Sequence, residues 1–520
     1  MIAPGVGLES LPPPAPLFAG VARGSLDAPG GDAEVQVLVL RASDTAVALV
    51  AVDMAAVDHA LRERVIDRLR EGDARLSPDG LVLCATGRYT GAEAGVFEGA
   101  IDRALFGAYD AQRAARAVEA ISDAIIRADT SVQNAQVVFG EQEASQFHVS
   151  RLGLDASLDS TLSVARIDTE TGVPLAWLVN YALYPPVSLG GAPQAGRATL
   201  AALSESLRTQ GGEDTAVLFL NGAAGDVKPN FAQGEQEGGR ELAETALRAL
   251  EGGLPKTEVA LALNARILPT PPTLLEGLVP EEILLQEVYV DRTVLLVIPA
   301  APAAQTALLL RVKALMQGAD HTFIVTGGND SLGMQPTARE FFAATPESRM
   351  AYFGPLMTMW FGERYLVTEN DGELWRDIPE LMQFEAAFRS AVARGAAEKT
   401  AIRAQWERTS TGLTAFAKLA RALAPIPEDY RVLLGSLGDE EAAIIARKAA
   451  ATYIRMEFAN FTEEERVRLM GVAEGADLPF DAVLLLQFLA NKAKMPQEVA
   501  GLIEMLAAQG HDLAGLDFLS

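Results

Sequence analysis

The sequence predicts a layered α/β fold followed by an all-helical C-terminal segment. Two observations support this prediction. Between about residues 20 and 365, short apolar runs of strand length alternate with stretches in which apolar residues recur at helical spacing. From about residue 375 the strand-like runs disappear, and Ala, Glu, Arg and Leu recur at helical spacing. We therefore expect a leader or arm over residues 1–17, an α/β domain over 18–370 and a helical domain over 371–520.

The first half of the α/β region has the order strand, strand, helix, strand, helix. Two apolar runs separated by a short turn predict the strands VQVLVLRA (35–42) and TAVALVAVD (45–53). HALRERVIDRLREG (59–72) has helical spacing and ends on a glycine, which is typical of a helix C-terminus. LVLCATG (81–87) is typical of a buried strand that enters a loop, and apolar spacing predicts a helix over 115–129.

The second half continues the alternation of strands and helices. LSVARIDTETGVPLAWLVNYALYP (162–185) predicts a hairpin with its turn at 169–173. The remaining elements are expected as a helix around 199–208, a strand at 217–220, a helix around 238–251 and strands at 293–300 and 322–330.

The chain is strongly acidic, with a formal net charge of -26 and a pI of about 4.6. Such a surface repels phosphate backbones, so we expect no nucleic-acid partner. The longest apolar runs, such as VLLLQFLA at 483–490, are too short to span a bilayer, so we expect no transmembrane segment. Residues 2–15 lack the basic start and apolar core of a signal peptide, and the compartment is left open.

Residues that commonly carry chemistry are few and scattered. The four histidines, His59, His148, His321 and His511, show no pair at metal-binding helical spacing, so each is expected to be a surface or structural residue. The single cysteine, Cys84, lies in an apolar strand without a histidine nearby in the sequence. We expect it to be a small buried residue and not a nucleophile.

Four loops follow predicted strands and carry the polar residues that could form a site. In open α/β sheets, ligands bind at the loops beyond the carboxyl ends of strands, so we expect these loops to converge. They are CATGRYTGAEAG (84–95), NYALYPPVSLGG (180–191), NGAAGDVKPN (221–230) and GGNDSLGMQPT (327–337).

These loops, in this order, resemble those of the neutral/alkaline ceramidase family. AGVARGSLDAPGGD (19–32) and FFAATPESRMAYFGP (341–355) add to the resemblance, which covers about residues 18–365. FLNGAAGDVKPN and GGNDSLGMQPT are its most specific pieces. The resemblance implies a ceramidase-like catalytic-domain fold, placed before the helical segment.

Members of that family are zinc amidases that cut the N-acyl bond of ceramide, and their zinc ligands are nitrogen and oxygen donors. Carried onto this sequence, the ligand positions fall on different residue types. Gly87, Arg88 and Tyr89 replace a His-Thr-His sequence, Tyr184 replaces the histidine before Pro185, Ala301 replaces the glutamate, Ser331 replaces the tyrosine after Asn329 and Asp330, and Lys228 replaces the key serine. The resemblance therefore implies a lost zinc site, and we expect no metal and no cofactor.

The same loops supply a candidate ligand pocket. Its members are expected to be Arg88, Tyr89, Tyr184, Asp226, Lys228, Asn329, Asp330 and Ser331. Lys228 is the candidate catalytic residue, because a buried lysine near tyrosines can act as a base. In the simpler interpretation, Asp226 and Asn230 hold the loop backbone, and Lys228 is paired or solvated and does no chemistry.

The C-terminal segment carries a second, shorter resemblance. ERVRLMGVAEGADLPFDAVLLLQF (465–488) resembles the segment before the nucleophile in the acyl-coenzyme A:isopenicillin N acyltransferase family of N-terminal-nucleophile amide hydrolases. Gly471 to Ala476 match its glycine-rich pattern, and Gln487 stands near its Asn position. Two helices packed through a small-residue turn are the structural alternative. Precursors of that family cut themselves just before a cysteine, so two interpretations stay open. Either a second chain that carries the nucleophile lies downstream of Ser520, or the gene stops there and both halves are without chemistry.

Three hypotheses about function follow. The chain is a ceramidase-like pseudoenzyme that binds an amide- or acyl-containing, lipid-like ligand or acts as a scaffold. Alternatively, it is the α chain of an autoprocessed two-chain amide hydrolase or acyltransferase. In the third hypothesis it is a metal-independent N-acyl amide hydrolase that uses a repurposed pocket around Lys228. Ceramidase relatives are often secreted or membrane-facing, so the resemblance alone implies an exported or periplasmic location.

Overall fold

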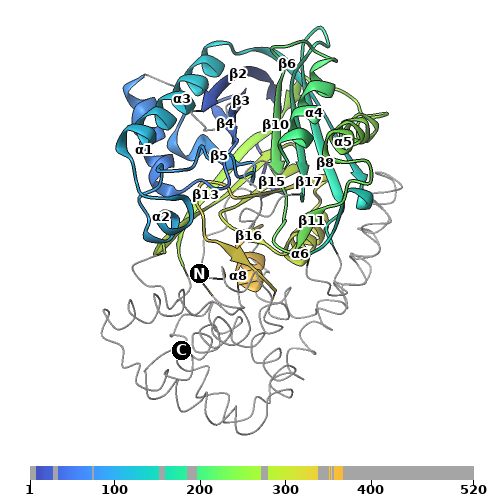
Figure 1. Ribbon diagram of the computed structural model, residues 1–520. Helices are drawn as coiled ribbons and strands as arrows, with labels where there is room; N and C mark the ends of the chain where they lie inside the picture. The colour runs from blue at the N-terminus through green and yellow to red at the C-terminus, as the bar shows by residue number, and fades with distance from the viewer. Residues whose placement is uncertain are drawn as a thin grey trace, which may run out of the picture.

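The computed structural model describes residues 7–26, 33–72, 75–151, 158–183, 196–270, 279–337, 351, 353 and 357–366. Within them the predicted α/β fold is confirmed, with helices lying against two main sheets (Figure 1). The helical segment predicted over 371–520, and with it the resemblance at 465–488, lies outside the described residues.

An eight-stranded sheet forms the larger half of the described structure. Its strands, in spatial order, are β10 (Ala216–Asn221), β9 (Pro174–Tyr181), β8 (Thr161–Thr169), β6 (Gln133–Glu143), β2 (Phe18–Leu26), β3 (Ala33–Ala42), β4 (Thr45–Val52) and β5 (Leu81–Ala85). The outermost pairs, β4 with β5 and β9 with β10, are parallel, and the inner pairs are antiparallel. Each parallel pair is joined by a crossover that contains a helix.

A second sheet of four strands packs against the first. It contains β13 (Leu261–Pro269), β14 (Glu282–Val290), β15 (Thr293–Ile298) and β17 (His321–Thr326), and β15 and β17 are parallel. Three short pairs complete the described strands: β1 (Ala15–Pro16) with β12 (Glu258–Val259), β7 (His148–Ser150) with β11 (Val227–Pro229), and β16 (Ala301–Pro302) with β18 (Met334–Gln335).

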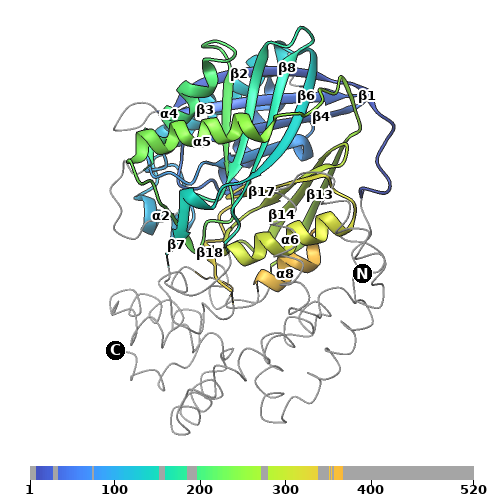
Figure 2. The ribbon, with the colours of Figure 1, turned by 90° about the vertical axis from the view of Figure 1, so that its right-hand side faces the viewer.

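The helices cover the outer faces of both sheets, so the described structure has the layers helix, sheet, sheet, helix (Figure 2). The described helices are α1 (His59–Glu71), α2 (Ala100–Phe106), α3 (Ala111–Thr130), α4 (Arg197–Arg208), α5 (Glu235–Ala249), α6 (Ala304–Met316) and α8 (Met357–Arg364). α1 and α3 cover the half of the large sheet that contains β2 to β5, and α4 and α5 cover the half that contains β8 to β10. α6 and α8 cover the smaller sheet.

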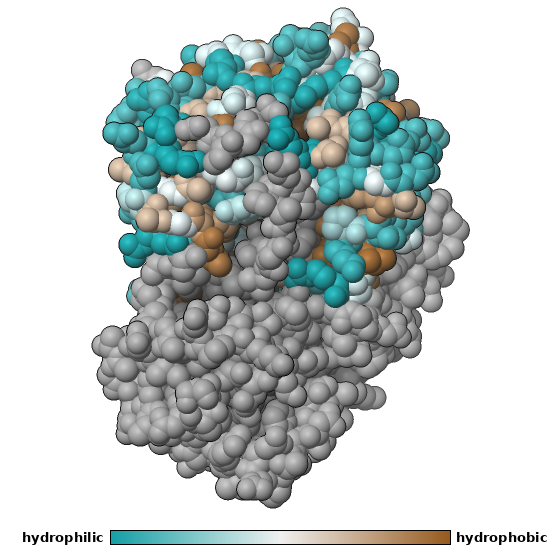
Figure 3. Space-filling model, viewed as in Figure 1, coloured by the Kyte–Doolittle hydropathy of each residue, from teal (hydrophilic) through white to brown (hydrophobic). Residues whose placement is uncertain are grey.

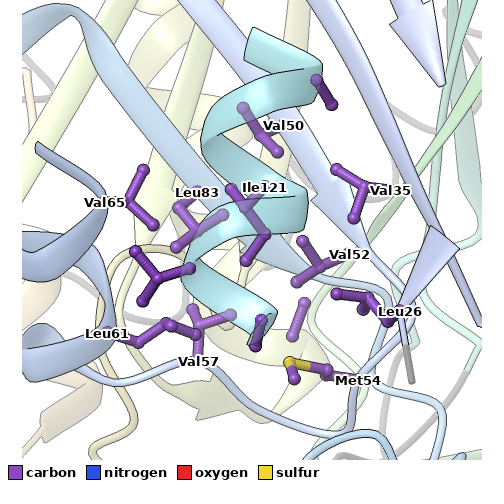
Figure 4. Packing of buried hydrophobic residues seen from close by; sticks show 14 of the residues in the cluster. Leu26, Val35, Val50, Val52, Met54, Val57, Leu61, Val65, Leu83 and Ile121 are labelled. Atoms are coloured by element: carbon purple, nitrogen blue, oxygen red, sulfur yellow. The ribbon is translucent and has the colours of Figure 1, made fainter. Parts of the chain in front are cut away.

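The alternation of side chains along the strands explains why both faces of the large sheet are buried. In β3, Val35 and Val37 face the α1–α3 layer, and Leu38 faces the second sheet. Figure 4 shows Ile121 of α3 among the side chains of Val50 and other strand residues. Fully burying an isoleucine of this kind contributes about 1.5–3 kcal/mol.

Two of the helices begin at residues that satisfy their first free N–H groups. Asp58 Oδ1 accepts a hydrogen bond from Leu61 N at 2.7 Å at the start of α1. Asp110 Oδ1 accepts from Gln112 N and Arg113 N, at 2.9 and 3.2 Å, at the start of α3. Aspartates in this position stabilise a helix by about 1 kcal/mol.

The described part of the N-terminal arm, residues 7–17, packs on the α/β region. Leu8 is buried with the side chains of α6 and α8, and Leu17 is buried between the sheets. Ala15 and Pro16 pair with β12.

The described residues on the face shown in Figure 3 are mostly hydrophilic. The large exposed hydrophobic side chains of the described residues include Leu254, Ile267 and Val173, which belong to different elements or loops. Among the described helices, none has both the length and the apolar character that crossing a membrane requires.

Candidate functional site

The four loops predicted from the sequence begin side by side. Gly222 N, after β10, donates to Tyr181 O at the end of β9 (2.9 Å). Thr326 Oγ1, at the end of β17, donates to Gly222 O (2.7 Å), and Ala85 N, at the end of β5, donates to Gly327 O (3.0 Å). The first residues of these loops therefore converge, as the sequence predicts.

Arg88 follows β5 and is buried. Its Nη2 donates to Asp53 Oδ2 at 2.8 Å, and the two side chains are 4% and 15% exposed. Thr86 Oγ1 donates to Asp53 Oδ1 at 3.1 Å. Burial raises the pKa of Asp53, although the charge of Arg88 and the Thr86 hydroxyl both favour the carboxylate. Arg88 Nε is buried and has no hydrogen-bond partner among the described residues.

A second charge network lies beside this pair and centres on Glu34. The Glu34 carboxylate accepts from Arg23 Nη2 at 2.7 Å, from Arg208 Nη2 at 3.1 Å and from the Gln36 side-chain amide. Burial alone would raise the pKa of Glu34, but Arg208 and Arg23 together lower it. The Glu34 backbone N–H also donates to Asp53 Oδ2 at 3.4 Å, which links the two networks.

These groups line a cavity of about 180 Å³ between the strands β3, β4 and β10 and the helix α4. Its polar wall includes Glu34, Asp53, Thr86 and Arg88. Sequence reasoning identified Arg88 and missed Glu34 and Asp53. Asp53 could have been predicted as a site residue, because it is a charged residue that directly follows the apolar run of strand 45–52.

The two tyrosines of the predicted pocket do not both appear in the described structure. Tyr89 is 36% exposed and stacks on Phe106 of α2, with ring centroids 6.3 Å apart. Tyr184 lies outside the described residues.

The loop after β10 places Asp226 and Lys228 in different surroundings. Asp226 is buried, and its Oδ1 accepts from Ala304 N at 2.8 Å, so it caps the first turn of α6. This contact fits the interpretation in which Asp226 holds backbone. Lys228 is exposed on β11, where it pairs with Val149 of β7. The burial that would activate a lysine as a base is absent at this residue.

The loop after β17 is docked on β5 and α1. Asn329 has a positive φ of 66°, and its Oδ1 accepts from Leu83 N (3.0 Å) and Arg62 Nε (3.2 Å). Asp330 Oδ1 accepts from Ser331 N at 2.8 Å and from His59 N at 3.4 Å. These contacts give Asn329 and Asp330 roles in holding the loop.

Asp330 also belongs to a group of acidic residues with unusual protonation. Burial raises its pKa from 3.8 to about 7, and the charges of Asp58 and Asp102 add to the effect. Burial likewise raises the pKa of Asp102 to about 7, with a contribution from Asp58. Asp58 lies at the start of α1, Asp102 in α2 and Asp330 in the loop after β17.

A serine and a histidine meet near the end of β9, which sequence reasoning did not anticipate. His148 Nε2 lies 3.1 Å from Ser160 Oγ, and His148 Nδ1 lies 2.8 Å from Ala182 O. The geometry resembles a nucleophile with its base. However, His148 and Ser160 are only 2% and 3% exposed, and neither lines the cavity beside Arg88. We therefore interpret the pair as a buried structural contact.

Comparison with known proteins supports the fold. Two solved structures are similar: "Crystal Structure Analysis of neutral ceramidase from Pseudomonas aeruginosa" and "Ceramidase complexed with C2". Each has a TM-score of 0.56, covers 68% of this chain and 74% of its own, and is 14% or 13% identical. The chain therefore has a ceramidase-like fold. The sequence matches no protein-family model and no curated protein.

Zinc, which the resemblance to ceramidases implies, does not fit the residues that the structure describes at the corresponding positions. Arg88 is a cation already paired with Asp53, and Ala301 offers only backbone groups in the β16–β18 pair. Ser331 is a poor zinc ligand compared with histidine, carboxylate or thiolate. Among the described residues, no three His, Cys, Asp or Glu side chains form a group that could hold a metal ion.

Proposed function

We propose that this chain is a ceramidase-like domain that has lost zinc-dependent chemistry and binds a ligand containing an amide or acyl group. The observation that carries the proposal is the buried Arg88–Asp53 pair. Arg88 lies in the loop that resembles the zinc-binding loop of ceramidases, and its fixed positive charge would repel a divalent cation there. Its N–H groups instead favour a hydrogen-bond acceptor such as a carbonyl oxygen.

The likeness to neutral ceramidases supports the choice of an amide or acyl group. Two of the similar solved structures are ceramidases, and the four converging loops begin at the strand ends where ligands bind in α/β folds. Because a fold does not carry its function without the site, this likeness suggests the ligand class and not the reaction.

The hypothesis of a metal-independent hydrolase has less support. It depends on Lys228 as a base, and Lys228 is exposed on β11. The hypothesis of a two-chain amide hydrolase depends on residues 465–488, which lie outside the described part.

The test uses the purified full-length chain and a ceramide presented in detergent micelles. Metal content is measured by mass spectrometry, ligand binding by equilibrium dialysis, and ligand integrity by mass spectrometry of the recovered lipid. We expect substoichiometric zinc and a ceramide that is bound and recovered intact. Lys228→Met serves as the matched variant, and its binding should equal that of the wild type.

Three outcomes would contradict the proposal. Stoichiometric zinc, together with fatty-acid release that a chelator stops, would identify a zinc amidase. Fatty-acid release that survives the chelator and is lost in Lys228→Met would identify the metal-independent hydrolase. Absence of ceramide binding would exclude ligands with an amide or acyl group as the proposed ligand class.

A further inference from the structure

The cavity beside Arg88 carries more positive than negative side chains. Its charged lining consists of Arg88, Arg197 and Arg208 against Glu34 and Asp53. This excess of positive charge is local, because the chain as a whole has a formal net charge of -26. An unbalanced charge in a partly desolvated space is unfavourable, and a bound anion would offset it.

The two carboxylates of the cavity are already paired within the protein. Asp53 Oδ2 lies 2.8 Å from Arg88 Nη2, and Glu34 Oε2 lies 3.1 Å from Arg208 Nη2. Glu34 also pairs at 2.7 Å with Arg23, which does not line the cavity and which adds to the positive charge around it. A cation would have to compete with these arginines for the carboxylates, so the charges favour an anionic ligand.

Arg88 keeps donor capacity beyond its contact with Asp53. The residue is 5% exposed and lines the cavity, and a guanidinium has five N–H donors in a planar fork. Nη2 donates to Asp53, and Nε has no acceptor among the described residues. Because an unsatisfied buried donor is costly and guanidinium forks match oxyanions, an anionic oxygen at this side chain would be favourable.

The helix α4 supplies the opposite wall. The cavity-lining residues of α4 recur every three or four positions and so lie on one face of the helix: Arg197, Leu200, Ala201, Ser204 and Arg208. Ser204 is half-buried, and its hydroxyl has no hydrogen-bond partner among the described residues. The apolar Leu200 and Phe219 lower the polarity of the space, which strengthens the attraction between an anion and the arginines.

The arrangement of donors and the volume limit the kind of anion. Arg88 approaches from the loop after β5 and Ser204 from α4, so donors face the cavity from opposite walls. A tetrahedral ion directs its oxygens to several sides, whereas a carboxylate presents two oxygens in one plane. The cavity has a volume of about 180 Å³, and one of about 150 Å³ holds a benzene molecule, so a group as small as phosphate fits.

We propose that this cavity is a binding site for a small tetrahedral oxyanion of the phosphate type. Arg88 and Ser204 donate hydrogen bonds to its oxygens, and Arg197 and Arg208 contribute positive charge. The inference goes beyond the proposed function, which concerns an amide or acyl group. The phosphate group comes either from the free ion or from a phosphate monoester.

The test measures the binding of inorganic phosphate to the full-length chain by calorimetry at pH 8 in 0.15 M NaCl. Chloride is in excess under these conditions, so a site that any anion can fill gives no signal. Sulfate and acetate are titrated in the same way. We expect phosphate and sulfate to bind at one site per chain and acetate to bind about tenfold more weakly or less.

Three variants locate the bound ion. Arg88→Lys keeps a positive charge beside Asp53 but removes the planar fork, and Ser204→Ala removes one hydroxyl donor. Each should weaken phosphate binding by about tenfold. Arg197→Gln removes one positive charge and should weaken it by about threefold. Ser204→Ala and Arg197→Gln leave the Arg88–Asp53 pair unchanged, so they keep the test decisive if Arg88→Lys does not fold.

Two variants outside the cavity serve as matched controls. Ser206 lies on the same helix as Ser204, but its Oγ donates to Ala202 O at 2.7 Å and it does not line the cavity. Arg240 is exposed on α5, where it pairs with Glu237 at 2.9 Å. Ser206→Ala and Arg240→Gln should therefore bind phosphate as the wild type does.

Glycerol 3-phosphate distinguishes the two sources of the phosphate group. If it binds as tightly as inorganic phosphate, the cavity accepts a monoester whose remainder extends out of the site. If only inorganic phosphate binds, the ligand is the free ion. Either result supports an oxyanion site.

Three results would overturn the inference. The first is no phosphate binding by the wild type, and the second is acetate binding as tight as that of phosphate. The third is phosphate binding that Ser204→Ala and Arg197→Gln weaken no more than their controls do, because the ion would then lie elsewhere on the protein.

Discussion

A guanidinium buried against a carboxyl group changes what the surrounding space can hold. Arg88 and Asp53 are both largely buried, so removing either partner would leave an uncompensated charge, which costs about 3–5 kcal/mol in proteins. The pair therefore has to persist when a ligand enters. Only ligands that leave it intact are compatible with the fold, and this argues against Zn²⁺ more strongly than the mere replacement of a histidine does.

Asp330 provides a residue-scale prediction about pH. Its folded-state pKa of about 7 lies above its ordinary value of 3.8, so between these values the folded protein binds more protons than the unfolded one. Stability contributed by this group is therefore present below about pH 4 and lost as the pH rises to about 7. Asp330→Asn keeps the acceptor for Ser331 N and His59 N and removes the titration. We expect the variant to be more stable than the wild type at pH 8, by up to about 4 kcal/mol, and equally stable near pH 4.

Urea denaturation at both pH values measures this difference. Asp44→Asn, in the exposed turn after β3, controls for the loss of one negative charge from an acidic protein. Equal stability of Asp330→Asn and the wild type at pH 8 would show that Asp330 is ionised in the folded protein without cost. Asp58 and Asp102 are the charged neighbours whose states contribute to the measured curve.

At the scale of elements, the contact of α3 with β2 yields a matched pair of substitutions. Gly20 and Gly24 both lie in β2 and face α3. A Cβ on Gly20 would lie 2.0 Å from Ala128 O, whereas a Cβ on Gly24 would lie 3.4 Å from Ala120 O and the Ala124 Cβ. We expect Gly20→Ala to destabilise the protein by about 1–3 kcal/mol, because the helix backbone must move. Gly24→Ala should change stability by less than about 0.5 kcal/mol. Thermal unfolding of the two variants tests this expectation. If Gly20→Ala is as stable as Gly24→Ala, the close approach of Ala128 O to Gly20 is contradicted.

Buried polar residues explain why two elements, β14 and α6, could not be predicted from the sequence. Uninterrupted apolar runs predicted β3, β4, β10 and β15 close to their observed bounds. β14 was missed because Gln286 and Glu287 interrupt its apolar run, although both are buried. Gln286 Nε2 donates to Leu81 O, and Glu287 pairs with Arg266, so partners distant in the sequence satisfy them.

The helix α6 was missed for a related reason. The charged residues Arg311 and Lys313 interrupt the apolar stretch of α6, which is typical of exposed positions, yet both side chains are buried. Arg311 Nε donates to both carboxylate oxygens of Asp159 at 3.0 Å, and Lys313 Nζ donates to Tyr365 O at 2.7 Å. Such pairings depend on the tertiary structure, and a single sequence does not reveal them.

At the scale of the whole molecule, the sequence predicted that four strand-end loops begin side by side, whereas the residues that form a site stay a prediction. Strand-end loops converge in any fold of this class, and the first residues of these four do so. Of the described candidates, Arg88 lines the cavity, whereas Asp226 caps α6 and Asn329 holds β5. The cavity lies between halves of the sheet that are far apart in the sequence, so Glu34 in β3 and Arg208 in α4 could be brought together only by the fold.

Net charge gives the last prediction. The chain has 69 acidic and 43 basic residues, so repulsion between like charges opposes the compact state at low salt. Salt screens both this repulsion and the surface ion pairs, but most exposed pairs contribute only about 0–1 kcal/mol each. An excess of 26 negative charges acts over the whole surface, and the screening length falls from roughly 30 Å at 0.01 M salt to roughly 8 Å at 0.15 M. We therefore expect the Tm to rise by about 1 °C over this range of NaCl, which corresponds to roughly 1 kcal/mol for a chain of 520 residues. Choline chloride at the same ionic strength should produce the same rise, because screening does not depend on the identity of the cation. A rise with NaCl alone would indicate a specific sodium site, and a fall in Tm would show that the ion pairs of the fold outweigh its net charge.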